Sequence, residues 1–125
     1  MRPAVKRLLT VALIFEVPPA LGFLLFPAAT LLILAGVTLD TSGVPVARVL
    51  GAALLAFCVL LWFARRSDSA EFARGAVACM FTYYAVSVVV LLLAQLSGQM
   101  GPTGWAMVLA HSALSVWCGY ALLKR

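Results

Sequence analysis

The feature that most constrains this chain is an apolar run from Leu8 to Phe26, LLTVALIFEVPPALGFLLF. Its length of about 19 residues, at ~1.5 Å per residue, is enough for a helix to cross the roughly 30 Å hydrocarbon core of a bilayer. The run contains one acidic residue, Glu16, followed by Pro18 and Pro19. It therefore predicts a membrane-spanning helix with a carboxyl group near its middle.

The composition of the whole chain also indicates a membrane protein. Of the 125 residues, 65% are hydrophobic and only 10% are charged, and the mean hydropathy is +1.11. Soluble domains have about 25% charged residues. A net charge of +5 can indicate a nucleic-acid partner, but the basic residues here lie at the ends of apolar runs, which is a topology signal. We expect a single all-α transmembrane domain over residues 1–125, with the lipid bilayer as its partner and no nucleic acid.

The apolar runs predict a four-helix bundle with one additional short helix. The predicted crossings are residues 8–26, 44–64, 75–96 and 105–123. The stretch from Leu8 to Leu39 is too long for one crossing and too short for two, so we expect a break at Pro27, since proline is tolerated in the first turn of a helix. Residues 27–37 then form a short interfacial or re-entrant helix. Protein or water must satisfy its backbone ends, because lipid offers no hydrogen bonds.

The basic residues predict how the chain is threaded through the membrane. Eight of the nine fall on one side of the predicted arrangement: Arg2, Lys6, Arg7, Arg65, Arg66, Arg74, Lys124 and Arg125. Arg48 alone falls on the other side. Because cytoplasmic segments of membrane proteins carry the excess of lysine and arginine, we expect both termini in the cytoplasm of a bacterial cell, and the protein in the inner (plasma) membrane.

Glu16 is the first candidate for a functional residue, because acids inside membrane-spanning segments are rare and usually face protein or a water-filled cavity. Ala12 and Ala20 lie about one turn away on either side, so this face can approach another helix closely. Three alternatives remain open for Glu16. It can be a structural residue, in an ion pair or as a neutral hydrogen-bonded acid. It can handle protons or cations, or it can bind a ligand.

Three further residues are candidates for the same ligand or proton site, namely Arg48, Tyr83 and His111. Arg48 either anchors the helix at the interface, alone or paired with Asp40, or points inward toward Glu16. Tyr83 needs a hydrogen-bond partner at mid-membrane, and Glu16 or His111 can supply it. Packing in the core is the alternative for both Tyr83 and His111. Haem ligation is not expected, because the chain has a single histidine.

Two polar stripes predict which faces of the third and fourth crossings point inward. One stripe is His111, Ser115 and Cys118, and the other is Gly75, Cys79, Tyr83 and Ser87. We take Ser87, Ser115 and Cys118 as supporting polar residues of the candidate site. The chain has no sequence motif of a catalytic, phosphate-binding or metal site, so we expect no catalytic residues, no metal and no cofactor.

Three segments, Leu21–Val37, Ala47–Leu55 and Trp62–Arg66, resemble the small four-helix inner-membrane proteins of bacteria that are loosely DoxX-like. The resemblance implies a four-helix inner-membrane fold, and the DoxX-like name suggests quinone-linked redox chemistry. Glu16 in the first of four helices is also similar to the mid-membrane acid of the small multidrug resistance exporters, which exchange protons for cationic drugs. The proline pair and the short helix depart from that second pattern.

These observations lead to three expectations of function. The first is a non-enzymatic protein, either an accessory or interaction subunit or a binder of a small amphipathic or lipid-like molecule. The alternative is a proton-coupled small transporter or channel that acts as an oligomer through Glu16. The third is a quinone-linked membrane redox protein, which needs a cavity beside His111 and Tyr83. Another membrane protein or a second copy of the chain is the expected protein partner.

Overall fold

The computed structural model describes residues 2–124 and confirms the predicted all-α fold, with four long helices and one short helix after the first. The helices are α1 (Pro3–Leu25), α2 (Pro27–Ala35), α3 (Val44–Arg66), α4 (Ala70–Leu96) and α5 (Gly104–Leu123). The four long helices α1, α3, α4 and α5 are each long and apolar enough to cross a membrane. Their surfaces are apolar as well, since Ile14, Val46 and Val116 are at least 70% exposed. Such surfaces are typical of helices that contact lipid.

The helix bounds differ from the predicted ones where polar residues continue a helix beyond its apolar run. α1 begins at Pro3, and α4 begins at Ala70, ahead of the residue-75 start that hydropathy predicts. The Ser69 hydroxyl caps α4 by accepting a hydrogen bond of 3.2 Å from Phe72 N. α2 ends at Ala35 and not at residue 37, because Gly36 takes a left-handed conformation with φ 65°.

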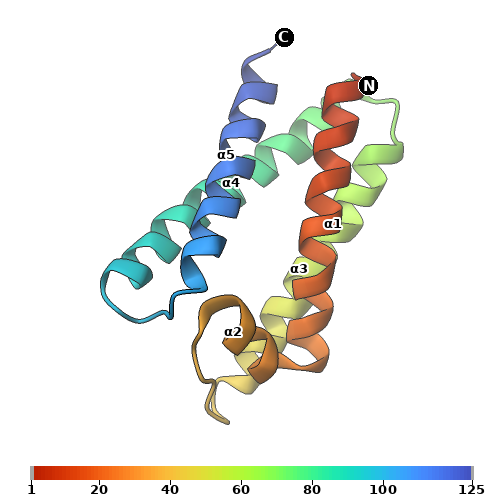
Figure 1. Ribbon diagram of the computed structural model, residues 1–125. Coiled ribbons are helices and arrows are strands. Elements are labelled where there is room, and N and C mark those ends of the chain that lie inside the picture. Colours follow the sequence, from red (N-terminus) through yellow and green to blue (C-terminus); the bar gives the residue numbers. More distant parts are fainter. Residues whose placement is uncertain (1, 125) are drawn as a thin grey trace.

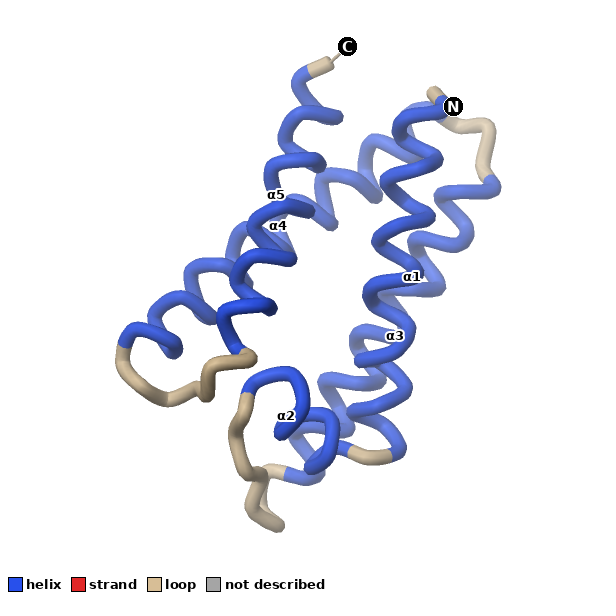
Figure 2. The backbone as a smooth tube through the Cα atoms, viewed as in Figure 1, coloured by secondary structure: helices blue, strands red, loops and turns tan. Residues whose placement is uncertain are grey.

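The four long helices form two closely packed pairs, α1 with α3 and α4 with α5 (Figure 1). Both termini lie at one end of the bundle, which we call the termini end. α2 lies at the opposite end, the α2 end, between the two pairs (Figure 2). The two pairs diverge toward the α2 end (Figures 1 and 2).

Small residues let α1 and α3 approach closely. Ala12 and Ala20 are fully buried on α1. A Cβ atom added to Gly51 of α3 would lie 2.9 Å from the Ala20 carbonyl oxygen and 2.7 Å from the backbone nitrogen of Leu24. Glycine is therefore required where the two backbones cross, as small residues are at many membrane helix contacts.

The buried core is divided between the two ends of the bundle. At the termini end it is formed by Leu8, Leu9, Ala12, Leu61, Ala64, Ala76, Val77, Met80, Tyr84, Leu114 and Cys118. At the α2 end a smaller cluster contains Ala20, Phe23, Ala47, Leu54 and Cys58. The larger cluster draws on all four long helices. The buried members of the smaller one come from α1 and α3, and partly buried residues of α2 and α4, among them Leu31, Leu34 and Tyr83, pack against them. The core therefore joins the two pairs at the termini end and leaves space between them at the α2 end.

The loop between α4 and α5 holds the C-terminal end of α2. Gly101 N donates a hydrogen bond of 2.8 Å to the Ala35 carbonyl, and Gln95 Nε2 donates one of 3.3 Å to the Gly101 carbonyl. A Cβ atom added to Gly36 would lie 2.8 Å from the Gly101 Cα. Protein atoms thus satisfy a terminal carbonyl of α2, as expected for a short helix next to lipid.

The described basic residues gather at the termini end, with the exception of Arg48 in the first turns of α3. Arg125 lies outside the described residues. Two hydrogen bonds tie basic side chains to the helices at this end. Arg2 Nη1 donates to the Lys124 carbonyl at 3.1 Å, and Arg65 Nε donates to Thr10 Oγ1 at 2.8 Å.

Candidate functional site

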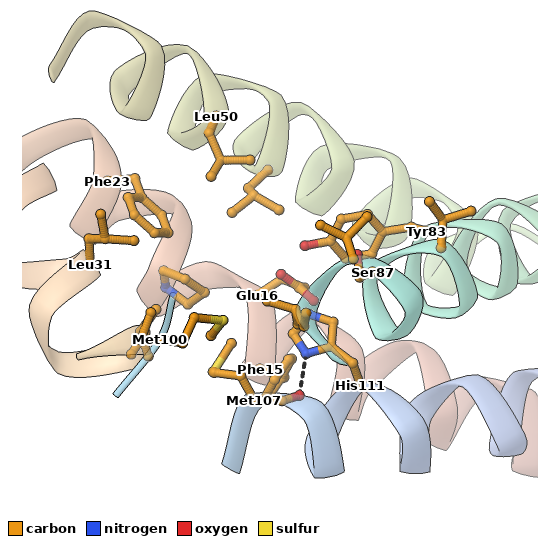
Figure 3. Close-up of a pocket in the computed structure, with 17 residues that line it drawn as sticks. Phe15, Glu16, Phe23, Leu31, Leu50, Tyr83, Ser87, Met100, Met107 and His111 are labelled. Atoms are coloured by element: carbon orange, nitrogen blue, oxygen red, sulfur yellow. Dashed lines mark hydrogen bonds between the residues drawn. The ribbon is translucent and has the colours of Figure 1, made fainter. Parts of the chain in front are cut away.

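A cavity of about 310 Å³ lies between the two helix pairs at the α2 end (Figure 3). All five helices contribute to its wall, together with Met100 from the loop before α5. The lining residues are Phe15, Glu16, Pro19, Phe23, Leu31, Leu34, Ala35, Leu50, Leu54, Tyr83, Val86, Ser87, Val90, Leu91, Met100, Met107 and His111. Its volume lies at the lower end of the roughly 300–1,000 Å³ that is typical of small-molecule sites.

The polar residues of the wall lie at one end of the cavity. They are Glu16, Tyr83, Ser87 and His111, and every other lining side chain is apolar. Figure 3 shows these four side chains near one another, whereas Phe23, Leu31, Leu50 and Met100 border the opposite end. The cavity thus has a polar end toward the middle of the bundle and an apolar end toward α2.

Glu16 is buried in the polar end without a charged partner. It is 1% exposed, and the Tyr84 hydroxyl lies beside its carboxyl group. Neither Glu16 Oε1 nor the Tyr84 hydroxyl completes a hydrogen bond. No basic side chain among residues 2–124 acts on this carboxyl. The Tyr84 hydroxyl is near enough to serve one carboxyl oxygen. A carboxyl group has several acceptor positions, so Glu16 keeps capacity for a further hydrogen-bond partner.

Pro18 and Pro19 add polar backbone atoms next to Glu16. α1 remains helical through both prolines. Because proline has no N–H group, the carbonyls one turn earlier, those of Ile14 and Phe15, lack their helical donors. Phe15 itself lines the cavity.

His111 is held in a defined orientation by its own helix and by three aromatic rings. Its Nδ1 lies 2.8 Å from the Met107 carbonyl oxygen. A carbonyl only accepts, so Nδ1 carries the hydrogen and Nε2 of the neutral ring is an acceptor. The ring centroids of Phe15, Tyr83 and Tyr84 lie 5.6, 6.1 and 5.6 Å from that of the imidazole.

The structure places three of the four candidate site residues in this cavity and the fourth elsewhere. Glu16, Tyr83 and His111 line it, but Arg48 is an exposed residue of α3 and does not. Long basic side chains near helix ends reach toward the interface, and Arg48 occupies such a position.

Asp40, the other residue considered as a partner of Arg48, is engaged by its own turn. Its Oδ1 accepts a hydrogen bond of 2.8 Å from Ser42 Oγ and another of 2.8 Å from Gly43 N. These hydrogen bonds hold the pKa of the Asp40 carboxyl below its usual range. Asp40 therefore closes the turn before α3 and takes no part in the cavity.

The polar stripes predicted the inward faces only in part. Ser87 lines the cavity, whereas Ser115 is half-buried and Cys118 belongs to the core at the termini end, so neither lines it. The prediction that Gly75 and Cys79 face inward was wrong, since both are exposed. The buried face of α4 is formed by Ala73, Ala76, Val77, Met80 and Tyr84.

Tyr84 is the residue of the site that the sequence reasoning missed. Its side chain is completely buried and lies next to both the Glu16 carboxyl and the His111 imidazole. The signal that could have found it is the four-residue spacing of Ala76, Met80 and Tyr84, which marks one helix face.

Comparison of the chain with protein-family models, with curated proteins and with solved structures finds no match. The resemblance to DoxX-like proteins therefore remains a prediction.

Proposed function

We propose that this protein binds a small amphipathic molecule in the cavity between its helix pairs. The polar end of the molecule would lie at Glu16 and His111, and its apolar end would extend toward α2. The observation that supports this proposal is the division of one cavity into a polar end and an apolar remainder. Sites for small molecules are mostly apolar, with a few polar groups that fix the orientation of the ligand.

The polar groups favour a ligand whose head donates a hydrogen bond. Nε2 of His111 offers a lone pair, because Nδ1 already donates to the Met107 carbonyl. The Glu16 carboxyl has an acceptor oxygen whether it is protonated or ionised. A hydroxyl, amide or amine group would therefore be matched to two acceptors at the same end of the cavity.

The charges of the wall disfavour an anionic ligand. None of the lysines and arginines among residues 2–124 lines the cavity, and Arg48 lies outside it. A carboxylate or phosphate buried there would lose its hydration without gaining a counter-charge, which is costly. We therefore favour a neutral or cationic head on an aliphatic body over a fatty-acid anion.

The experiment compares 1-dodecanol with dodecanoate at pH 8, in competition with a fluorescent long-chain alcohol on the protein in nanodiscs. We expect the wild type to bind dodecanol at least about tenfold more tightly than dodecanoate. Glu16→Met should weaken dodecanol binding by about tenfold, because the ligand hydroxyl loses an acceptor in a buried site. Glu71→Met makes the same change at an exposed position in the first turn of α4 and should leave binding unchanged.

Equal binding of the two probes, or the same loss with Glu71→Met, would contradict the proposal. Thermal unfolding of each variant without probe shows whether the fold is kept. If Glu16→Met lowers dodecanol binding only because it unfolds, Glu16→Gln, which keeps an acceptor oxygen, must bind dodecanol like the wild type for the proposal to stand.

For the membrane, we propose insertion in the inner (plasma) membrane with both termini in the cytoplasm. The gathering of basic residues at the termini end supports this orientation. In a variant with Cys58, Cys79 and Cys118 replaced, we expect a membrane-impermeant maleimide to label Thr41→Cys on intact spheroplasts. Ser69→Cys should be labelled only after permeabilisation. The reverse labelling pattern would show that the topology is opposite to the one proposed.

Proton-coupled transport is the second candidate, and the buried Glu16 carboxyl without a basic partner favours it. If the protein only binds its ligand, proteoliposomes that enclose a pH-sensitive dye will show no proton flux above protein-free vesicles. A flux that is present with wild type and lost with Glu16→Gln would place transport ahead of binding alone.

The third expectation, quinone-linked redox chemistry, requires a cavity beside Tyr83 and His111, and the cavity lies there. An oxidised quinone has only acceptor oxygens, whereas its reduced quinol form carries hydroxyl donors. Glu16 and Nε2 of His111 can accept from the quinol, whereas the hydroxyls of Tyr83 and Ser87 at the same end can donate to the oxidised quinone. A short-chain quinol that displaces the fluorescent alcohol more strongly than dodecanol does would favour this candidate.

A further inference from the structure

A second cavity, of about 190 Å³, lies at the termini end between α1, α4 and α5. Three basic side chains border it, and they come from three different segments of the chain: Arg2, Arg74 and Lys124. Among residues 2–124, no acidic residue lines it. The rest of its wall is apolar and consists of Val5, Ala70, Ala73, Val77, Ala121 and Leu122.

The cavity is built on fixed parts of the fold. Ala73 and Val77 of its floor are 3% and 2% exposed, so they belong to the packed face of α4. Arg2 Nη1 donates to the Lys124 carbonyl at 3.1 Å, which joins the start of α1 to the end of α5. Arg2 and Lys124 thus lie at helix ends that are held together, and Arg74 is the fifth residue of α4.

We propose that this cavity binds the phosphate of an anionic phospholipid headgroup in the leaflet at the termini end. Arginine and lysine side chains are the usual partners of phosphate oxygens, and arginine can bind two of them at once. Basic pockets between membrane-spanning helices are suited to anionic headgroups. The apolar wall favours a lipid over free phosphate, because the glycerol and upper acyl chain of a lipid can cover the half-buried Val5 and Leu122.

The remaining basic residues at the same end border two other cavities. One, of about 480 Å³, is lined by Lys6, Arg7 and Arg65, but all three come from α1 and α3, and it does not touch the junction of α1, α4 and α5. The other, of about 340 Å³, is bordered by Lys6, Arg65 and Arg66, but Asp68 lies in its wall. The acid offsets part of the positive charge there and would repel a phosphate. These residues therefore provide a matched control with similar charge and location.

The experiment measures lipid retention by native mass spectrometry after detergent extraction, with phosphatidylglycerol or phosphatidylcholine of identical acyl chains. We expect the wild type to keep one phosphatidylglycerol under conditions that remove phosphatidylcholine. Removing two charges with Arg74→Gln and Lys124→Gln together should weaken phosphatidylglycerol binding about tenfold or more. Lys6→Gln with Arg66→Gln should leave it unchanged.

Three results would overturn the proposal. They are equal retention of the two lipids, an equal loss in the Lys6 and Arg66 control, and displacement of the lipid by millimolar inorganic phosphate, which would indicate a site for a small free anion. Unfolding temperatures in phosphatidylcholine show whether the variants fold. If the double variant does not, the single Arg74→Gln must show a partial loss of phosphatidylglycerol while Arg66→Gln shows none.

Discussion

Replacing Gly51 by leucine will disrupt the packing of α1 against α3 and lower the unfolding temperature of the protein sharply. A side chain at Gly51 meets backbone atoms, the Leu24 nitrogen at 2.7 Å and the Ala20 oxygen at 2.9 Å. Backbone of a helix cannot rotate away as a flexible side chain can. Overpacking of a core costs about 1–3 kcal/mol in typical cases, and we expect a loss at or above the top of that range.

Gly75→Leu is the matched control for this prediction. Gly75 also lies within a long apolar helix, α4, but a Cβ atom there meets nothing within 4 Å. Both replacements gain about 1 kcal/mol of helix propensity from the loss of glycine, so propensity cancels in the comparison. The unfolding temperatures of the two variants in detergent provide the measurement. Similar temperatures would mean that the close crossing of α1 and α3 is not what holds that pair together.

Replacing Val90 by tryptophan will block the cavity and abolish binding of a long-chain alcohol while the fold is kept. Val90 lines the cavity on α4 and is 59% exposed, so a larger ring can be accommodated without displacing core residues. The indole would occupy space that the aliphatic body of the ligand needs. We expect a loss of dodecanol binding of at least about 100-fold, equivalent to ~2.8 kcal/mol.

The neighbouring residue offers a close control for the tryptophan. Val89 is 57% exposed and does not line the cavity. Val89→Trp therefore adds the same ring to the same helix at almost the same exposure, and it should bind dodecanol as the wild type does. If both variants lose binding, or both keep it, the alcohol binds somewhere other than this cavity.

Much of the fold follows from the sequence because a bilayer restricts what an apolar chain can do. Runs of about 20 apolar residues must cross as helices, and Pro27 marks where α2 begins after α1. The beginnings of α1 and α4 could not be predicted from hydropathy, since these helices continue through polar residues such as Arg7 and Glu71. Hydropathy indicates where the chain leaves the membrane, whereas a helix continues for as long as its backbone hydrogen bonds do.

The sequence predicts which residues form the candidate site better than it predicts the shape of the site. Glu16, Tyr83 and His111 stand out as polar residues at similar depth, and they line one cavity. The polar stripe selected Tyr83 alone, although Tyr84, about 100° around the helix, continues the buried spacing of Ala76 and Met80. Both tyrosine rings lie beside the histidine ring. The cavity arises because the two helix pairs diverge toward α2, and that divergence depends on packing that no periodic pattern specifies.

The most direct test of the central claim is photo-crosslinking with a long-chain alcohol that carries a diazirine near its hydroxyl group. Labelling is carried out in nanodiscs with and without excess dodecanol, and adducts are located by mass spectrometry. We predict that the labelling prevented by dodecanol falls on residues at the polar end of the cavity, chiefly Glu16 and Tyr83, and is absent from Val90→Trp. Competed adducts confined to lipid-facing residues such as Ile14 and Val116, or no competed adducts at all, would contradict a ligand site between the helix pairs.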